Sequence, residues 1–447
     1  MSLDDAAVRS AVSSVLPSVR DDLAELVAIE SVSSLPEKSD QVRRSAELVA
    51  EKLRQIGCPD VKVVAEDGHP AVIAHFPAPE GQPTICLYSH HDVQPTGDPE
   101  LWSTPPFQLV ERDGRLYGRG SNDDKAGISV HLGALRAFDG KPPVGVTLFI
   151  EGEEEIGSPS LARLIEKYHD ELVSDVFVIC DATNWEAGQP SFTTTLRGVA
   201  DCVVELRTLD HALHSGGFGG VVPDALTTMC RLLATLHDEK GNVAIKGLKT
   251  SPAPDLDYPE DRLRAESGVL DGVEWIGDGS AVSRLWNKPA CTVLAIDCTS
   301  VADASNTLAP VARAKVSLRV APGDDAASAL DALVAHLEQN VPWGAQVSVT
   351  RGETGDPGIV PFEGELAETA RAAFRDAWDG TEPVQVGCGG SIPMISDFQR
   401  AFPQAQVLVT AVADPDGRPH GIDESQSLDD LNKACLAEAL LLARMAR

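Results

Sequence analysis

Positive charge is the scarcest property of this chain. The 447 residues include 37 Lys and Arg but 68 Asp and Glu, so the formal net charge at pH 7 is −31. A surface this acidic repels phosphate backbones and anionic lipid headgroups. We therefore expect neither a nucleic-acid partner nor a membrane-surface partner. The acidity is compatible with solubility and with cation binding, and composition does not choose between them.

Two further features are missing. The nine cysteines are scattered and no two of them have CxxC spacing, which argues against a zinc ribbon or a thioredoxin-type redox site. No run approaches the roughly 20 apolar residues that a membrane-spanning helix needs. The opening residues, MSLDDAAVRS, carry acids where a signal peptide carries basic residues. We expect a cytoplasmic protein with reduced thiols.

The length predicts at least two domains. Up to about residue 196, short β-branched runs alternate with helical stretches, and this texture returns after residue 357. Such alternation predicts an α/β domain, with a mainly parallel mixed sheet covered by helices. Between these parts, long alternating strands and two helices predict an inserted, smaller α+β domain of ferredoxin-like type, with an irregular stretch over 239–289. The predicted domains are residues 1–196 and 358–447, interrupted by 197–357.

Acidic and histidine residues gather where predicted strands end, and open α/β sheets bind ligands at such places. His90 and Asp92 follow the strand predicted over Thr84–Tyr88 and share one face of it, so the carboxylate can orient an imidazole that binds metal. A His-x-acid pattern occurs four times, but only His90 ends an apolar strand. His91 points to the opposite face, and we assign it a structural role.

Three more clusters follow the same rule. Asp123 lies in YGRGSNDDKAG before a predicted helix, where Asp123 or Asn122 could alternatively serve as an N-cap. Glu154 and Glu155 belong to a run of adjacent carboxylates, which repel one another unless a cation or proton relieves them. Asp181 ends the run VFVIC, and His420 lies in a polar loop. Oxygen and nitrogen ligands without sulfur suit Zn, Mn or Co, and three carboxylates with two neutral imidazoles balance two divalent ions and a hydroxide better than one ion.

The motifs HHDVQP, GRGSNDDKAG, EGEEEIGS, ALHSGGFGG and GGSIP, in this order, resemble those of the co-catalytic zinc peptidases and deacylases. That family includes carnosinase-like dipeptidases, carboxypeptidase G, aminoacylase and succinyl-diaminopimelate desuccinylase, and the likeness is nearest to the dipeptidase branch. The resemblance implies a dinuclear metal-dependent amide hydrolase that cleaves dipeptides. An N-acyl amino acid deacylase or carboxypeptidase on the same scaffold is the alternative. A non-enzymatic cation-binding or structural protein is a third reading. It predicts oxygen-only ligands and no general base, whereas this sequence has both histidines and Glu154.

The resemblance also implies roles for individual residues. His90 and Asp181 would hold one metal ion, and Glu155 and His420 the other. Asp123 would bridge both metal ions, and its peptide bond to Asp124 would be cis. Asp92 would orient His90, and Glu154 would be the general base. Zn²⁺ is the first expectation for the two ions, with Mn²⁺ and Co²⁺ as alternatives.

Further roles fall on the inserted domain, which the resemblance makes a lid and dimerisation unit. His214 would reach across a homodimer to stabilise the oxyanion, although it is alternatively a turn histidine beside glycines. The groups that would bind the polar ends of a dipeptide or N-acyl amino acid are Asn306, Arg319, Gly390 and Ser391. Arg319 is alternatively a surface strand residue, and Arg197 is a further candidate contact. Cys388 departs from the Glu that carnosinase-like members commonly carry before GGSIP, which puts recognition of a free amine in doubt.

Overall fold

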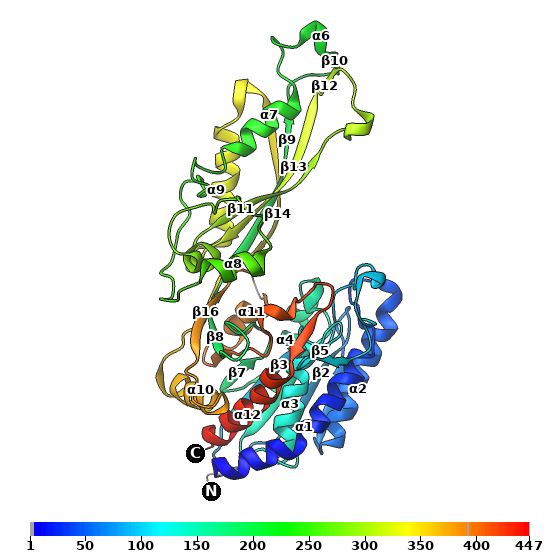
Figure 1. Ribbon diagram of the computed structural model, residues 1–447, viewed down its shortest axis with the longest axis vertical. Coiled ribbons are helices and arrows are strands. Elements are labelled where there is room, and N and C mark those ends of the chain that lie inside the picture. The colour runs from blue at the N-terminus through cyan, green and yellow to red at the C-terminus, as the bar shows by residue number, and fades with distance from the viewer. Residues whose placement is uncertain (1–3, 391–392, 447) are drawn as a thin grey trace. The chain divides into compact units, whose positions relative to one another are not determined.

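The computed structural model describes residues 4–390 and 393–446, which form a mixed α/β fold divided into two compact units (Figure 1). The first unit contains the described residues up to Thr194, together with Val360–Val386 and the part from Asp397 onward. The second contains Thr195–Ile359 and the described residues of Gly387–Ser396. The expected α/β class is confirmed. None of the described helices is both long and apolar enough to cross a bilayer.

The first unit is built on a six-stranded sheet with the order β1-β2-β6-β3-β7-β17. The four strands from β6 to β17 are mutually parallel, whereas β1 and β2 pair antiparallel. The carboxyl ends of the four parallel strands therefore lie at the same edge of the sheet. The strands are β1 (Asp60–Val64), β2 (Ala71–Phe76), β3 (Thr84–His90), β6 (Gly145–Glu151), β7 (Val176–Ile179) and β17 (Gln406–Val409).

Helices and aromatic side chains bury both faces of this sheet, because successive residues of a strand point to opposite faces. Leu87 and its neighbours on one face pack into a core with five helices. On the other face, Tyr88, Phe149 and Phe177 contact Phe398 of α11 (Pro393–Ala401), with ring centroids 4.6–6.2 Å apart. The helices of the first face are α1 (Asp5–Val27), α2 (Ser39–Gln55), α3 (Lys125–Ala137), α10 (Gly364–Ala377) and α12 (Leu428–Met445). Two short helices, α4 (Leu161–Lys167) and α5 (His169–Leu172), follow β6.

The second unit contains a four-stranded antiparallel sheet with the order β11-β13-β9-β14. Alternate residues of β9 and β13 are buried against α7 and α9, so one face of the sheet carries the core of this unit. Along the chain the order is β-α-β-β-α-β. The elements are β9 (Gly198–Arg207), α7 (Ala225–Ala234), β11 (Ala290–Asp297), β13 (Val311–Val320), α9 (Ala326–Gln339) and β14 (Gln346–Gly355).

The expectation of an irregular stretch over 239–289 is wrong at α8 (Glu260–Ser267). Two i,i+4 ion pairs, Arg262 with Glu266 and Arg264 with Glu260, stabilise this exposed helix, and Gly268 ends it in the left-handed conformation with φ of 64°. The sequence analysis also missed several short elements. These are β4 (Val110–Arg112), β5 (Arg115–Tyr117), β8 (Ser191–Leu196), β10 (Leu213–His214), α6 (Ser215–Phe218), β12 (Thr307–Leu308), β15 (Gly358–Ile359), β16 (Val384–Cys388), α11 (Pro393–Ala401) and β18 (Ser425–Ser427).

Candidate metal centre

Six of the predicted site residues converge at the carboxyl-terminal edge of the sheet in the first unit. His90 is the last residue of β3, Glu154 and Glu155 follow β6, and Asp181 follows β7. Asp123 precedes α3, and His420 precedes β18. Parallel strands bring residues from distant parts of the chain to one edge, which is where open α/β sheets bind ligands.

Asp123 lies between the two histidines. Its Oδ1 is 3.0 Å from Nε2 of His90, and its Oδ2 is 3.0 Å from Nε2 of His420. Each histidine thus faces a separate oxygen of one carboxylate, which is the arrangement a bridging ligand requires. The peptide bond between Asp123 and Asp124 is cis, as the resemblance implied.

The donor atoms fall into two groups around Asp123. His90, Glu154 and Asp181 present donor atoms within 4.8 Å of one another, and so do Asp123, Glu155 and His420. Nε2 of His420 lies 3.1 Å from Glu155, and Nε2 of His90 lies 3.7 Å from Asp181. Imidazole nitrogen and carboxylate oxygen, without thiolate, are donors that suit divalent ions such as Zn²⁺, Mn²⁺ or Co²⁺.

The electrostatics of these groups also fit cation binding. Burial and the neighbouring Asp181 raise the pKa of Glu154 to about 9. Burial raises the pKa of Asp181 to about 6, although His90 opposes the shift. Hydrogen bonds with Asp123 and Glu155 raise the pKa of His420 to about 10. Burial and crowding thus favour the protonated forms of Glu154 and Asp181, and two divalent cations would relieve the repulsion between the carboxylates. The residues present therefore fit a pair of divalent metal ions.

Asp92 and Gln94 form hydrogen bonds with two of the proposed metal ligands, His90 and Glu155. Nδ1 of His90 lies 3.1 Å from the backbone oxygen of Asp92 and 3.4 Å from its Oδ1, so Nδ1 donates and Nε2 is left as the metal-facing nitrogen. Asp92 Oδ2 accepts from the backbone N–H of Glu155 at 3.1 Å. Gln94 donates to the Glu155 carboxylate from its backbone N–H at 3.1 Å and from Nε2 at 2.9 Å.

The second unit carries the other predicted contacts, at two separate places. The exposed His214 ends β10, and its Nδ1 accepts from the backbone N–H of Gly216 at 3.1 Å. Beside it, the backbone oxygen of Asn306 accepts from Ser215 at 2.9 Å, so the structure brings His214 and Asn306 together. Arg319 lies instead at the far end of β13. Gly390 follows the β16 segment, and Ser391 lies outside the described residues.

Arg197 and Arg319 face the same side of the sheet. Arg319 pairs with Val199 in the antiparallel register, and Arg197 stands two residues before Val199, hence diagonally beside Arg319. Burial first, and then the charge of Arg319, lowers the pKa of Arg197 to about 10. The Arg197 backbone N–H and Nε donate to the carbonyls of Cys388 and Gly389, both at 3.1 Å. Within the described part of the chain neither guanidinium forms an ion pair with a carboxylate, so the place favours an anion.

Residues 86–444 match peptidase family M20/M25/M40. Over 427 residues the chain is 34% identical to a cysteinylglycine-S-conjugate dipeptidase from Corynebacterium striatum, and the aligned part covers 94% of each chain. The chain belongs to this peptidase family. Its fold is similar to that of the di-peptidase Dug1p from Saccharomyces cerevisiae, with a TM-score of 0.83, 24% identity and coverage of 100% and 99%. It is also similar to human carnosine dipeptidase 1, with a TM-score of 0.82, 25% identity and 98% coverage of both chains. The predicted likeness to the dipeptidase branch is confirmed.

Sequence analysis of this peptidase missed two residues that hold the site together, Arg119 and Glu424. Both are almost completely buried and form an ion pair. Arg119 Nη2 donates to the carbonyl of His420 at 3.1 Å, while Glu424 Oε1 accepts from the backbone N–H of Asp123 at 3.1 Å. The pair therefore connects the backbones of two proposed ligands. Arg119 stands inside the GRGSNDDKAG motif, but nothing in the motif shows that its partner is Glu424.

One sequence expectation at the site is corrected. The N-cap of α3 is Asp124, whose side chain accepts from the backbone N–H of Gly127 at 3.3 Å, and not Asp123 or Asn122. Asn122 donates instead through its side chain to Ser425 and Gln426. The carboxylate of Asp123 consequently does not cap the helix and instead contacts His90 and His420. His91 is buried and bonded through Nε2 to the carbonyl of Pro70 at 2.8 Å, in agreement with a structural role.

Proposed function

We propose that this peptidase hydrolyses dipeptides with two divalent metal ions held in the first unit. The observation that carries the proposal is the carboxylate of Asp123, which lies between His90, Glu154 and Asp181 on one side and His420 and Glu155 on the other. His90 and Asp181 are assigned to one ion, Glu155 and His420 to the other, and Asp123 to both. Zn²⁺ is the proposed ion because imidazole and carboxylate donors suit it, and Mn²⁺ or Co²⁺ would be accepted by the same groups.

Glu154 is the proposed general base. It stands beside His90 and Asp181, and the assignment of ligands given above leaves it outside the set of either ion. Its carboxylate takes a proton from the attacking water and returns it to the nitrogen of the leaving amine. The ions, when bound, supply Lewis-acid polarisation of the amide carbonyl and acidify water. Cations also oppose the repulsion from Asp181, so that Glu154 is ionised and ready to accept the proton.

Arg319 is the proposed anchor for the carboxylate of the substrate. Its guanidinium presents a planar fork of donors, and Arg197 beside it adds a second positive charge. The two guanidinium groups repel each other and have no carboxylate partner among the described residues, so binding of an anion between them would relieve the repulsion. A dipeptide and an N-acyl amino acid both carry such a group. Asn306, Gly390 and Ser391 remain proposed contacts for other polar groups of the substrate.

We also propose that the second unit is a ferredoxin-like lid and dimerisation domain. Its β-α-β-β-α-β order and antiparallel sheet support the fold type. β11 is an edge strand, and it exposes Leu294 and Ile296 at 57% and 38%, which favours pairing with a second copy of the chain.

The position of His214 supports the same dimer. β13 begins a few residues after Asn306 and ends beside Arg319, and a ten-residue strand spans about 30 Å. Figure 1 shows β10, β12 and α6 together at one end of this unit. His214 and Arg319 of one chain are therefore too far apart to hold the same dipeptide. We propose that His214 stabilises the oxyanion in the partner's site, and that each site needs both chains.

Metal analysis coupled to substrate profiling tests the proposed function. The purified chain is stripped of metal, reloaded with Zn²⁺, Mn²⁺ or Co²⁺, and offered free dipeptides and N-acetyl amino acids. Hydrolysis of dipeptides with about two ions per chain supports the proposal. Cleavage of N-acetyl amino acids without cleavage of dipeptides would instead establish the deacylase alternative, which the presence of Cys388 near Arg197 keeps open. A cytoplasmic location stays a prediction, supported by nine free thiols.

A further inference from the structure

A buried polar chain lies behind the candidate metal centre. His131 of α3 stands between Glu438 of α12 and Ser89 of β3. Its Nδ1 is 2.8 and 3.0 Å from the two carboxylate oxygens of Glu438, and its Nε2 is 3.0 Å from Ser89 Oγ. The side chains of His131 and Glu438 are 0% and 4% exposed. The sequence analysis did not single out any of these three residues.

The acceptors around the ring show how this chain of hydrogen bonds is directed. Nε2 of His131 also lies 3.1 Å from the backbone oxygen of Tyr88, which can only accept. Nε2 therefore carries hydrogen and donates, and Ser89 Oγ accepts from it. The hydroxyl hydrogen of Ser89 is then free to point away from the ring.

The Asp124 carboxylate lies beside the Ser89 hydroxyl, since both border Gly127, and it accepts from the backbone N–H of His90 at 3.3 Å. Asp124 is thus bonded to the ligand-bearing end of β3 and is the covalent neighbour of Asp123. Gly127 leaves room for this contact, because a Cβ there would lie 2.5 Å from Asp124 Oδ1, 2.5 Å from Ser89 Oγ and 2.6 Å from the carbonyl of Cys180.

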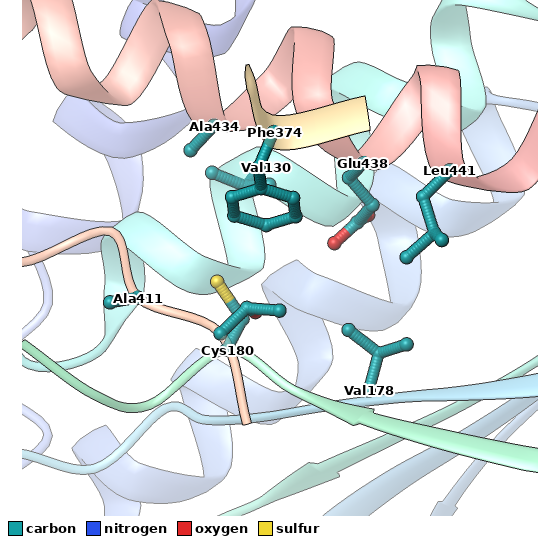
Figure 2. A pocket seen from close by; sticks show the side chains of 9 residues that line it. Val130, Val178, Cys180, Phe374, Ala411, Ala434, Glu438 and Leu441 are labelled. Atoms are coloured by element: carbon teal, nitrogen blue, oxygen red, sulfur yellow. The ribbon is translucent and has the colours of Figure 1, made fainter. Parts of the chain in front are cut away.

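The surroundings of Glu438 argue that the pair has a purpose beyond packing. Its carboxylate borders a small cavity whose other lining is mostly apolar, including Val178, Phe374 and Leu441 (Figure 2). Burying a carboxylate in such surroundings is costly, and an ion pair there is commonly no more stable than apolar side chains of the same volume. A network of this kind does, however, fix the direction of each hydrogen bond it contains.

We propose that His131 and Glu438 are positioning residues for the metal centre. Through Ser89 they fix the carboxylate of Asp124, and Asp124 fixes the backbone at His90 and the direction of Asp123. The inference rests on the proposed function only in taking His90 and Asp123 as metal ligands. Groups that orient ligands from behind typically change metal affinity or activity by about 10–100-fold when they are lost.

The affinity of the full chain for Zn²⁺ tests this inference, measured by competition with a chromogenic chelator. Ser89→Ala removes the connection between His131 and Asp124 and leaves the His131–Glu438 pair in place. His131→Phe removes the contacts of His131 with both Ser89 and Glu438. We expect each variant to bind Zn²⁺ about 10–100-fold more weakly, and the Zn²⁺-loaded variants to lose kcat rather than KM. Lys52→Met is the matched control, since Lys52 forms another buried ion pair, with Asp22 at 2.9 Å, that joins α1 and α2.

The outcomes separate positioning from stability. The control should lower the melting temperature and leave Zn²⁺ affinity unchanged. If Ser89→Ala binds Zn²⁺ within about twofold of the natural chain, the network is structural only and the inference is overturned, even where His131→Phe fails to fold. Because affinity is measured without substrate, a chain that binds Zn²⁺ as expected but cleaves no dipeptide contradicts the proposed substrate and not this inference.

Discussion

Asp92 accepts a hydrogen bond from the backbone N–H of Glu155 at 3.1 Å and thereby joins the ends of two parallel strands, β3 and β6. The same residue accepts from Nδ1 of His90 through its backbone oxygen. Asp92 is completely buried, and its hydrogen bonds with His90 hold its pKa below the ordinary value although burial opposes this. Asp92 thus orients a proposed ligand of each metal ion, Glu155 through its carboxylate and His90 through its backbone oxygen and through Oδ1, which lies 3.4 Å from Nδ1.

Replacing Asp92 should therefore weaken both metal sites together. We expect Asp92→Ala to lower Zn²⁺ affinity and kcat by about 10–100-fold, while Asp92→Asn keeps an acceptor for the Glu155 N–H and loses less. Equilibrium dialysis against Zn²⁺, with counting of bound ions per chain, measures the effect. Loss of a single ion with normal retention of the other would show that Asp92 serves one ligand only.

Glu154→Gln separates the base from the ligands. The amide is close in size to the carboxylate but cannot accept the proton of water, so kcat should fall by about 10²–10⁴-fold. The ion count should stay the same, since Glu154 is outside the proposed ligand set. A variant that loses metal in proportion to activity would instead make Glu154 a ligand, which its place beside His90 and Asp181 also permits.

The strongly periodic parts of the fold could be predicted from the sequence. The sequence predicts a strand over Ala71–Phe76 and helices over Ala326–Gln339 and Leu428–Met445, and these are the bounds of β2, α9 and α12. A continuous apolar strand or a 3.6-residue pattern leaves little choice. β8 was missed because SFTTTL is polar and does not alternate. Its pairing partners β15 and β16 are far away in the chain, and only tertiary structure supplies them.

The candidate site divides in the same way. His90 and Asp123 stand in motifs at strand and helix ends, so their convergence could be inferred from the chain. Arg119 and Glu424 could not be found in this way, because charged residues are expected on the surface and these two are 305 residues apart. Their role depends on complete burial, which no local pattern shows.

Arg319 can be tested through the charge of the substrate. Arg319→Met should raise KM for free dipeptides by about 10–100-fold, since hydrogen bonds to charged groups contribute about 1.5–3 kcal/mol. The natural chain should prefer a dipeptide over its C-terminal amide, and the variant should treat the two more nearly alike. Arg197→Met serves as the comparison. If Arg319→Met keeps the full preference for the free carboxylate, the anchor lies elsewhere.

Mixed dimers test whether His214 acts in the partner's site. His214→Ala and Glu154→Gln chains should each be nearly inactive alone. In a dimer containing one of each, the His214→Ala chain keeps Glu154 and receives His214 from its partner, so one complete site forms. An equal mixture should recover about a quarter of the natural activity after subunit exchange. Absence of recovery, with mixed dimers verified by differently tagged chains, would place His214 in its own chain's site.

The effect of pH on metal stabilisation follows from the raised pKa values. Glu154, at about 9 against an ordinary 4.5, and His420, at about 10 against 6.5, both bind protons more tightly in the folded metal-free chain. Their contribution to stability is present below the ordinary pKa values and is lost as pH rises toward 9–10. His420 must lose its proton to bind metal, so Zn²⁺ affinity should increase over the same window.

The gap in melting temperature between Zn²⁺-loaded and metal-free chain should therefore widen from about pH 6 to about pH 9. Thermal unfolding of both forms at fixed total Zn²⁺ measures it. Metal-free Glu154→Gln should lose stability less steeply with pH than the natural metal-free chain, because its side chain no longer titrates. A gap that stays constant or narrows toward pH 9 would contradict the assignment of His420 as a ligand, because a ligand that needs no deprotonation gives Zn²⁺ no advantage at high pH.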